Sequence, residues 1–107
     1  MTKDEIISLI ETTTNSVMVE HFEDFKNKTT SLNLNVNYTE YVNISLDRQF
    51  AEIIKTVLIK NGFELNNIKK SDFNSYANVL LLCKDRVEAF MNNYLDKVVK
   101  PYIETIK

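Results

Sequence analysis

The chain has 107 residues, of which 44% are hydrophobic and 26% are charged, and its net charge at pH 7 is −2. These values are close to those of an average globular protein and predict one small domain with a modest core, which excludes a largely disordered chain. The single cysteine excludes an intramolecular disulfide and a zinc site built on several thiolates.

The N-terminal segment predicts a helix over about residues 3–26. Thr2 and Glu5 have the spacing of a capping box, in which each side chain accepts a hydrogen bond from the backbone N–H of the other residue. Apolar residues then recur at helical intervals, at Ile6, Ile7, Ile10, Val17, Met18, Phe22 and Phe25. The polar stretch 26–30 is expected to end this helix.

The stretch SLNLNVNYTEYVNISLD, residues 31–47, predicts two strands. Leucine, valine and tyrosine alternate with asparagine over about 32–38, and apolar residues alternate again over about 41–46. A period of two is typical of a half-buried strand. The strands would pair as a hairpin, with one continuous strand as the alternative, because the apolar phase is the same in both halves. The side chains expected to point away from the core are Asn33, Asn35, Asn37, Asn43 and Ser45.

Two further helices are predicted, over about 47–61 and 71–100. Gly62 is a strong stop signal for the first of them, since glycine takes the left-handed conformation cheaply. Ser71 is expected to cap the second, in which apolar residues recur in steps of three and four, at Phe73, Tyr76, Leu80, Cys83, Val87, Phe90 and Tyr94. Pro101 is expected to kink or end it. The predicted fold class is therefore a helix-dominated α+β single domain, in the order helix, β-hairpin, helix, long helix.

Residues that could carry catalysis are few. His21 is the only histidine, and we interpret it as a residue at the edge of the apolar stripe, because one histidine without partner ligands makes no metal site. Cys83 falls on a predicted core position, where a cysteine behaves as a small hydrophobic residue. With one glycine in the chain, a phosphate-binding loop is not expected. We predict a protein that is not an enzyme and has no cofactor, no metal and no small-molecule substrate.

One segment resembles a known family. YVNISLDRQFAEIIKTVLIKNG, residues 41–62, resembles the start of a ribbon-helix-helix DNA-binding domain, in which an alternating strand leads into a helix. The resemblance implies a dimer that reads the major groove with strand 41–46, through Tyr41, Asn43 and Ser45. The segment departs from that family in its position, since about forty residues precede it, and in its lack of Lys or Arg on the strand.

A protein partner is favoured over nucleic acid, because the net charge is negative and no block of basic residues occurs. The chain has no apolar run that could span a membrane, and we expect it in the cytoplasm. The predicted function is a protein-binding inhibitor, adaptor or regulator, encoded by a low-GC bacterium, its phage or a mobile element. The alternatives are the dimeric DNA-binding regulator and a structural subunit of a phage or other assembly. Self-association as a dimer is a further expectation. The predicted partner-binding residues are Asn33, Asn35, Asn37, Tyr38, Tyr41, Asn43, Ser45, Tyr94 and Tyr102.

Overall fold

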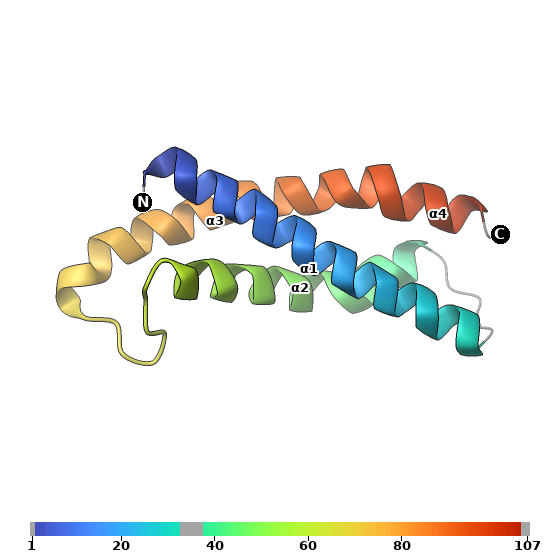
Figure 1. Cartoon of the computed structure of the whole chain (residues 1–107), viewed down its shortest axis with the longest axis horizontal. Helices are drawn as coiled ribbons and strands as arrows, with labels where there is room; N and C mark the ends of the chain where they lie inside the picture. Colours follow the sequence, from blue (N-terminus) through green and yellow to red (C-terminus); the bar gives the residue numbers. More distant parts are fainter. Residues whose placement is uncertain (1, 33–37, 106–107) are drawn as a thin grey trace.

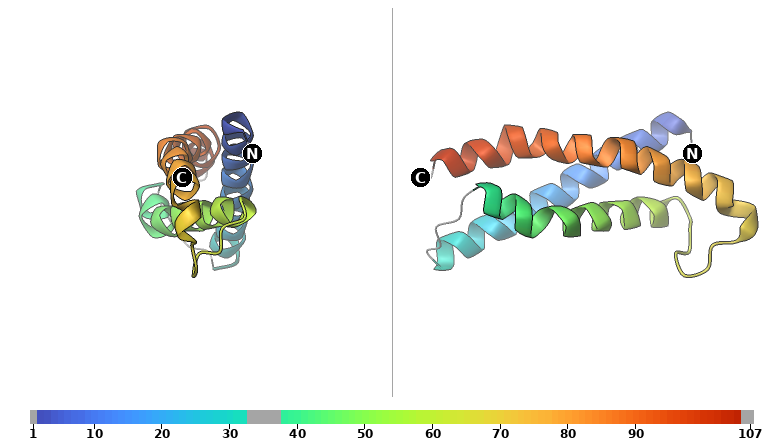
Figure 2. Two further views of the ribbon diagram at one scale, coloured as in Figure 1. Left: turned by 90° about the vertical axis from the view of Figure 1, so that its left-hand side faces the viewer. Right: turned by 180° about the vertical axis from the view of Figure 1, so that it is seen from behind.

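A computed structural model describes residues 2–32 and 38–105. Over these residues the chain forms an elongated helical bundle of 52 × 25 × 17 Å. Helices α2 and α3 lie side by side and run in opposite directions, and α1 crosses this pair diagonally (Figure 1; Figure 2, right). The elements in chain order are α1 (Lys3–Leu32), α2 (Tyr38–Lys60), the 3₁₀ turn η1 (Lys70–Asp72), α3 (Phe73–Tyr94), the π-helical turn η2 (Leu95–Val99) and α4 (Lys100–Thr105).

The predicted α+β fold class is wrong, because the structure has no strand within residues 2–32 and 38–105. The second predicted strand, 41–46, lies inside α2. Most of the first predicted strand, 32–38, falls on 33–37, which lie outside the described residues, and its two end residues belong to α1 and α2. The β-hairpin is therefore replaced by helix on both sides of 33–37.

The reason for this error is visible in the burial pattern of α2. Residues four apart, such as Val42 and Leu46, share a face both in a strand and in a helix. Both of these residues pack against the core, and burial continues at helical intervals of three and four residues through Gln49, Ile53 and Val57. Packing against α1 and α3 thus follows the helical period of the longer segment, rather than the short alternation at its start.

The predicted capping box at the start of α1 is confirmed. The backbone N–H of Glu5 donates to Thr2 Oγ1 at 3.2 Å, and the backbone N–H of Thr2 donates to Glu5 Oε1 at 3.3 Å. These hydrogen bonds with Thr2 lower the pKa of the Glu5 carboxyl from its usual value. The helix also runs past its predicted end near Lys26, as far as Leu32. Ion pairs one turn apart, Glu23–Lys26 at 2.6 Å and Asp24–Lys28 at 2.9 Å, support this extension.

The predicted stop at Gly62 is also confirmed. The backbone N–H of Phe63 donates to the carbonyl of Leu58, and that of Gly62 donates to the carbonyl of Ile59. This is the Schellman arrangement, and it requires the left-handed conformation that Gly62 adopts, with φ of +89°. The loop that follows leads to α3.

Replacing Gly62 by alanine is expected to lower the free energy of unfolding by about 1 kcal/mol. A Cβ at this position would meet nothing within 4 Å, so the cost arises from the backbone conformation alone. Urea denaturation followed by circular dichroism measures it. Gly62→Asn is the matched control, because asparagine tolerates this conformation better, and it should lose less stability than Gly62→Ala. Equal losses in both variants would contradict the backbone explanation.

The third helical segment, which comprises η1, α3, η2 and α4, differs from its prediction at both ends. Ser71 lies within η1, so it is not the cap of α3; Asp72 precedes the first residue of α3 and makes no side-chain capping hydrogen bond. Pro101 does not end the helix, which continues through α4 to Thr105. The π turn η2 comes just before, with the N–H of Lys100 donating to the carbonyl of Leu95. Widening the helix there is a known way to relieve the clash of a proline ring with the preceding turn.

The hydrophobic core runs along the whole bundle and confirms most of the predicted apolar stripes. The side chains that are most completely buried include Ile10, Met18, Ile53, Cys83, Val87, Met91, Val99 and Ile103. Phe73 is an exception, because it belongs to the predicted stripe of α3 but is 53% exposed. In Figure 1 the first turns of α3 project beyond the start of α1 and the end of α2, which leaves this part of the helix uncovered.

Candidate protein-binding surface

Three of the predicted binding residues come together around one phenylalanine. The ring of Phe22 meets the rings of Tyr41, Tyr94 and Tyr102 edge to face, with centroids 6.2, 6.3 and 5.3 Å apart. Lys26 Nζ lies 4.8 Å from the Phe22 centroid and 5.6 Å from that of Tyr102. Because Tyr41 is fully buried and the other two tyrosines are half-buried, this aromatic cluster joins the three helical segments as part of the core.

Tyr41 is one of three buried residues in the described part of the chain whose side chains carry an unpaired polar atom. The Tyr41 hydroxyl, Gln49 Nε2 and Thr13 Oγ1 are buried and have no hydrogen-bonding partner among the described residues. Burial raises the pKa of Tyr41, and the nearby side chain of Gln49 opposes this rise. Unpaired polar groups inside a core reduce stability. None of the three side chains is exposed to a binding partner.

The remaining predicted binding residues do not form the outer face of a sheet. Asn33, Asn35 and Asn37 lie outside the described residues. Tyr38 and Ser45 belong to α2, and Asn43 is exposed on the same helix. The strand on which the ribbon-helix-helix resemblance depended, 41–46, is helical, so that the mode of DNA reading that the resemblance implied is lost.

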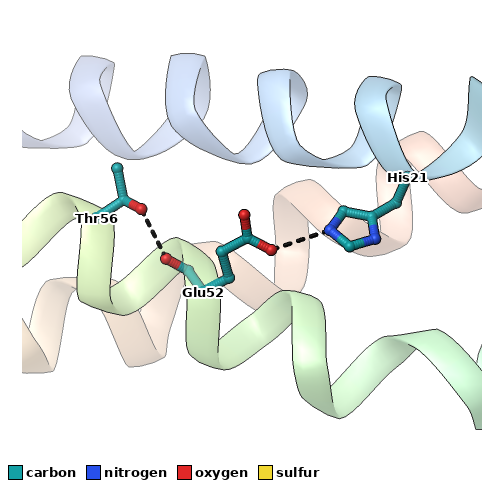
Figure 3. Close-up of polar contacts among 3 residues, drawn as sticks. All are labelled: His21, Glu52 and Thr56. Carbon is teal, nitrogen blue, oxygen red and sulfur yellow. Dashed lines mark hydrogen bonds and ion pairs between the residues drawn. The ribbon is translucent and has the colours of Figure 1, made fainter. Parts of the chain in front are cut away.

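His21 links two helices (Figure 3). Its Nε2 lies 2.9 Å from Glu52 Oε2, and the Thr56 hydroxyl donates to the backbone carbonyl of Glu52 at 2.9 Å. His21 is half-buried and Glu52 is exposed, so water screens the pair and its contribution to stability is small. The contact ties α1 to α2 at the edge of the apolar stripe, in agreement with the interpretation made from the sequence.

Cys83 has the opposite environment. Its side chain is completely buried on the inner face of α3, as the heptad spacing predicted. Burial raises the pKa of its thiol to about 11, so the group is protonated and a poor nucleophile at neutral pH.

An open, mainly apolar groove of about 420 Å³ lies between the start of α1 and the first half of α3. Its lining residues define what we call the α1–α3 groove: Lys3, Ile6, Asn78, Leu81, Leu82 and Asp85. Leu81 is 59% exposed, more than any other large apolar residue among the described ones. The groove is thus lined by apolar residues, among them an uncovered leucine, together with one lysine and one aspartate.

A second hollow of about 430 Å³ adjoins this groove and shares Ile6 and Asn78 with it. It is more polar and reaches the loop at Gly62 and the start of α3. Phe73 lies two turns before Leu81 on α3, with the exposed Ala77 between them at intervals of four residues. All three side chains are exposed, and the first turns of α3 project beyond α1 and α2 (Figure 1).

The groove was not among the predicted sites, although one signal in the sequence pointed to it. The run Val79 to Cys83 is entirely apolar, and a helix cannot turn five consecutive side chains toward one side. In the structure Val79 and Cys83 face the core, while Leu81 faces outward. The sequence did not reveal that the start of α1 would lie beside this leucine, because that depends on the crossing of two helices far apart in the chain.

The described part of the chain contains neither a cluster of metal-ligating side chains nor a helix that could cross a membrane. Within 2–32 and 38–105, no three His, Cys, Asp or Glu side chains gather where they could hold a metal ion. No described helix combines the length and the apolar character needed to cross a bilayer. Comparison with protein-family models, with curated proteins and with solved structures found no match to this chain.

Proposed function

We propose that this chain is a non-enzymatic, cytoplasmic protein-binding protein that acts as an adaptor, inhibitor or regulator through the α1–α3 groove. The observation that carries the proposal is the exposed Leu81 beside an apolar groove, on a helix whose first turns are uncovered. Contiguous exposed apolar surface is costly to leave in water, and it is typical of a surface that another protein covers.

The mechanism is steric and needs no chemistry from the chain. An apolar side chain of the partner would enter the groove between Ile6 and Leu82, while Leu81 packs against the partner's surface. Lys3 and Asp85 at the groove's edge would orient the partner by charge, since rim charges set specificity more than affinity. The rigid α1 and α3 would hold these residues in place, so that little order has to be gained on binding.

Photo-crosslinking in the cells that naturally produce the protein tests this proposal. A photoreactive phenylalanine derivative replaces Leu81 in one variant and Ile59 in a control variant. Ile59 is a matched control because it is 52% exposed but lies on α2, outside the residues that line the groove. We expect position 81 to give a discrete crosslinked protein, identified by mass spectrometry, and position 59 to give none.

The contrary result is equally clear. If position 81 gives no product, or the same set of products as position 59, the groove is not a binding surface and the proposal fails. Circular dichroism of both variants checks that each retains the helix content of the native chain. This removes unfolding as a cause of a missing product.

A further inference from the structure

The α1–α3 groove has charges arranged in a self-complementary way. Helices α1 and α3 run in the same direction (Figure 1), with Lys3 one turn before Ile6 on the α1 wall and Asp85 one turn after Leu81 on the α3 wall. The cation and the anion therefore lie on opposite walls of the groove. Neither forms an ion pair with another of the described residues.

A two-fold axis that runs between these two residues relates one copy of the groove to a second copy that faces it. In such a dimer Lys3 of each copy would face Asp85 of the other copy, and the contact would occur twice. The apolar residues between them would meet across the axis, so that each copy offers its exposed Leu81 and receives that of the other beside Ile6 and Leu82. The same surface thus supplies both the anchor and the groove that the anchor needs.

We infer that the occupant of the α1–α3 groove is a second copy of this chain, bound as a two-fold symmetric dimer with paired Lys3–Asp85 contacts. The inference rests on the proposed function, since it names the protein that the groove binds. A partner of another kind would have to bring an acidic group to Lys3, a basic group to Asp85 and an apolar anchor between them. A second copy carries all three in the required order.

The oligomeric state of the purified chain is the first test of the inference. Sedimentation equilibrium is expected to show a dimer of about 25 kDa, twice the 12.5 kDa of the chain, with a Kd of about 1–100 µM. Leu81→Lys should weaken this dimer on the order of a hundredfold, because the anchor is lost from both copies. Ile59→Lys, which is similarly exposed but lies outside the groove lining, should leave the dimer unchanged.

Charge reversal then tests the symmetry. Lys3→Glu alone sets two carboxylates against each other at both contacts of the homodimer, and Asp85→Lys alone sets two ammonium groups against each other. Each homodimer should therefore weaken by about tenfold or more. Mixing the two variants is expected to restore association, because each contact of the mixed dimer joins groups of opposite charge. One contact pairs the introduced glutamate with the introduced lysine, and the other pairs the native Lys3 with the native Asp85. A pair that acted only within one chain would not be restored by mixing.

The outcomes separate this inference from the proposed function. A native chain that stays monomeric at about 1 mM, a Leu81→Lys variant that dimerises normally, or a mixture no stronger than its components would each overturn the dimer. If the dimer is absent and position 81 still crosslinks to a protein of another mass, the proposed function stands with a different partner. If position 81 gives no specific product in cells, the proposed function fails by itself.

Discussion

Phe22→Ala is expected to lower the free energy of unfolding by about 3–5 kcal/mol. Phe22 is only 3% exposed, and its ring meets those of Phe25, Tyr41, Tyr94 and Tyr102. Truncation removes contacts to α2 and to both sides of the π turn in the third helical segment, and it leaves a cavity. For a chain of this size the loss is a large part of a total stability of about 5–15 kcal/mol.

Urea denaturation followed by circular dichroism measures this loss, and Val19→Ala is the matched control. Val19 lies on the same helix, three residues away, but it faces solvent. Its replacement by alanine should change stability by less than about 0.5 kcal/mol, or raise it slightly, because alanine is the better helix former. A loss for Phe22→Ala no larger than that of Val19→Ala would show that the aromatic cluster does not hold the helices together.

The second large effect is a loss of stability at alkaline pH. Burial raises the pKa of the Cys83 thiol from 9.0 to about 11, so the folded state holds this proton more tightly than the unfolded state. Stability from this group is therefore fully present below pH 9 and is lost as the pH rises toward 11. The free energy of unfolding should fall by about 2–3 kcal/mol across that window, at about 1.36 kcal/mol for each pKa unit.

Comparison with Cys83→Ala isolates the contribution of the thiol. Burial also raises the pKa values of Tyr41 and Tyr94, so these tyrosines too reduce stability at high pH. They do so equally in the native protein and in the variant. The variant should be less stable at pH 7 because of the lost side chain, but its stability should fall less steeply between pH 9 and 11. Parallel pH curves for the two proteins would show that the thiol does not titrate with folding.

Some local features of the structure were predictable. The capping box of Thr2 and Glu5 and the left-handed stop at Gly62 depend only on residues within one turn, and both are present. The buried positions Cys83 and Val87 followed from heptad spacing over a long segment. The predicted fold class was wrong because the alternation at 41–46 is too short to distinguish a strand from a helix. Residues four apart share a face in both conformations.

The candidate site was less predictable than the fold. Tyr41, Tyr94 and Tyr102 were expected at a binding surface because tyrosine suits interfaces, yet they converge on Phe22 and help to form the core. Leu81 was not singled out, although its place in an apolar run implied that one side chain would face outward. Whether an apolar residue is covered depends on which helix crosses it, and residue spacing along one helix does not specify this.

By itself the sequence determined where helix α1 starts and where α2 stops, and that no disulfide can form within the chain. Those features depend on residue types at fixed short spacings, whose energies are local. Only the tertiary structure decided that 38–46 is helical and that Lys3, Leu81 and Asp85 share one groove. The physical reason is that burial chooses between two local conformations of similar energy, and burial depends on the three helical segments packing together.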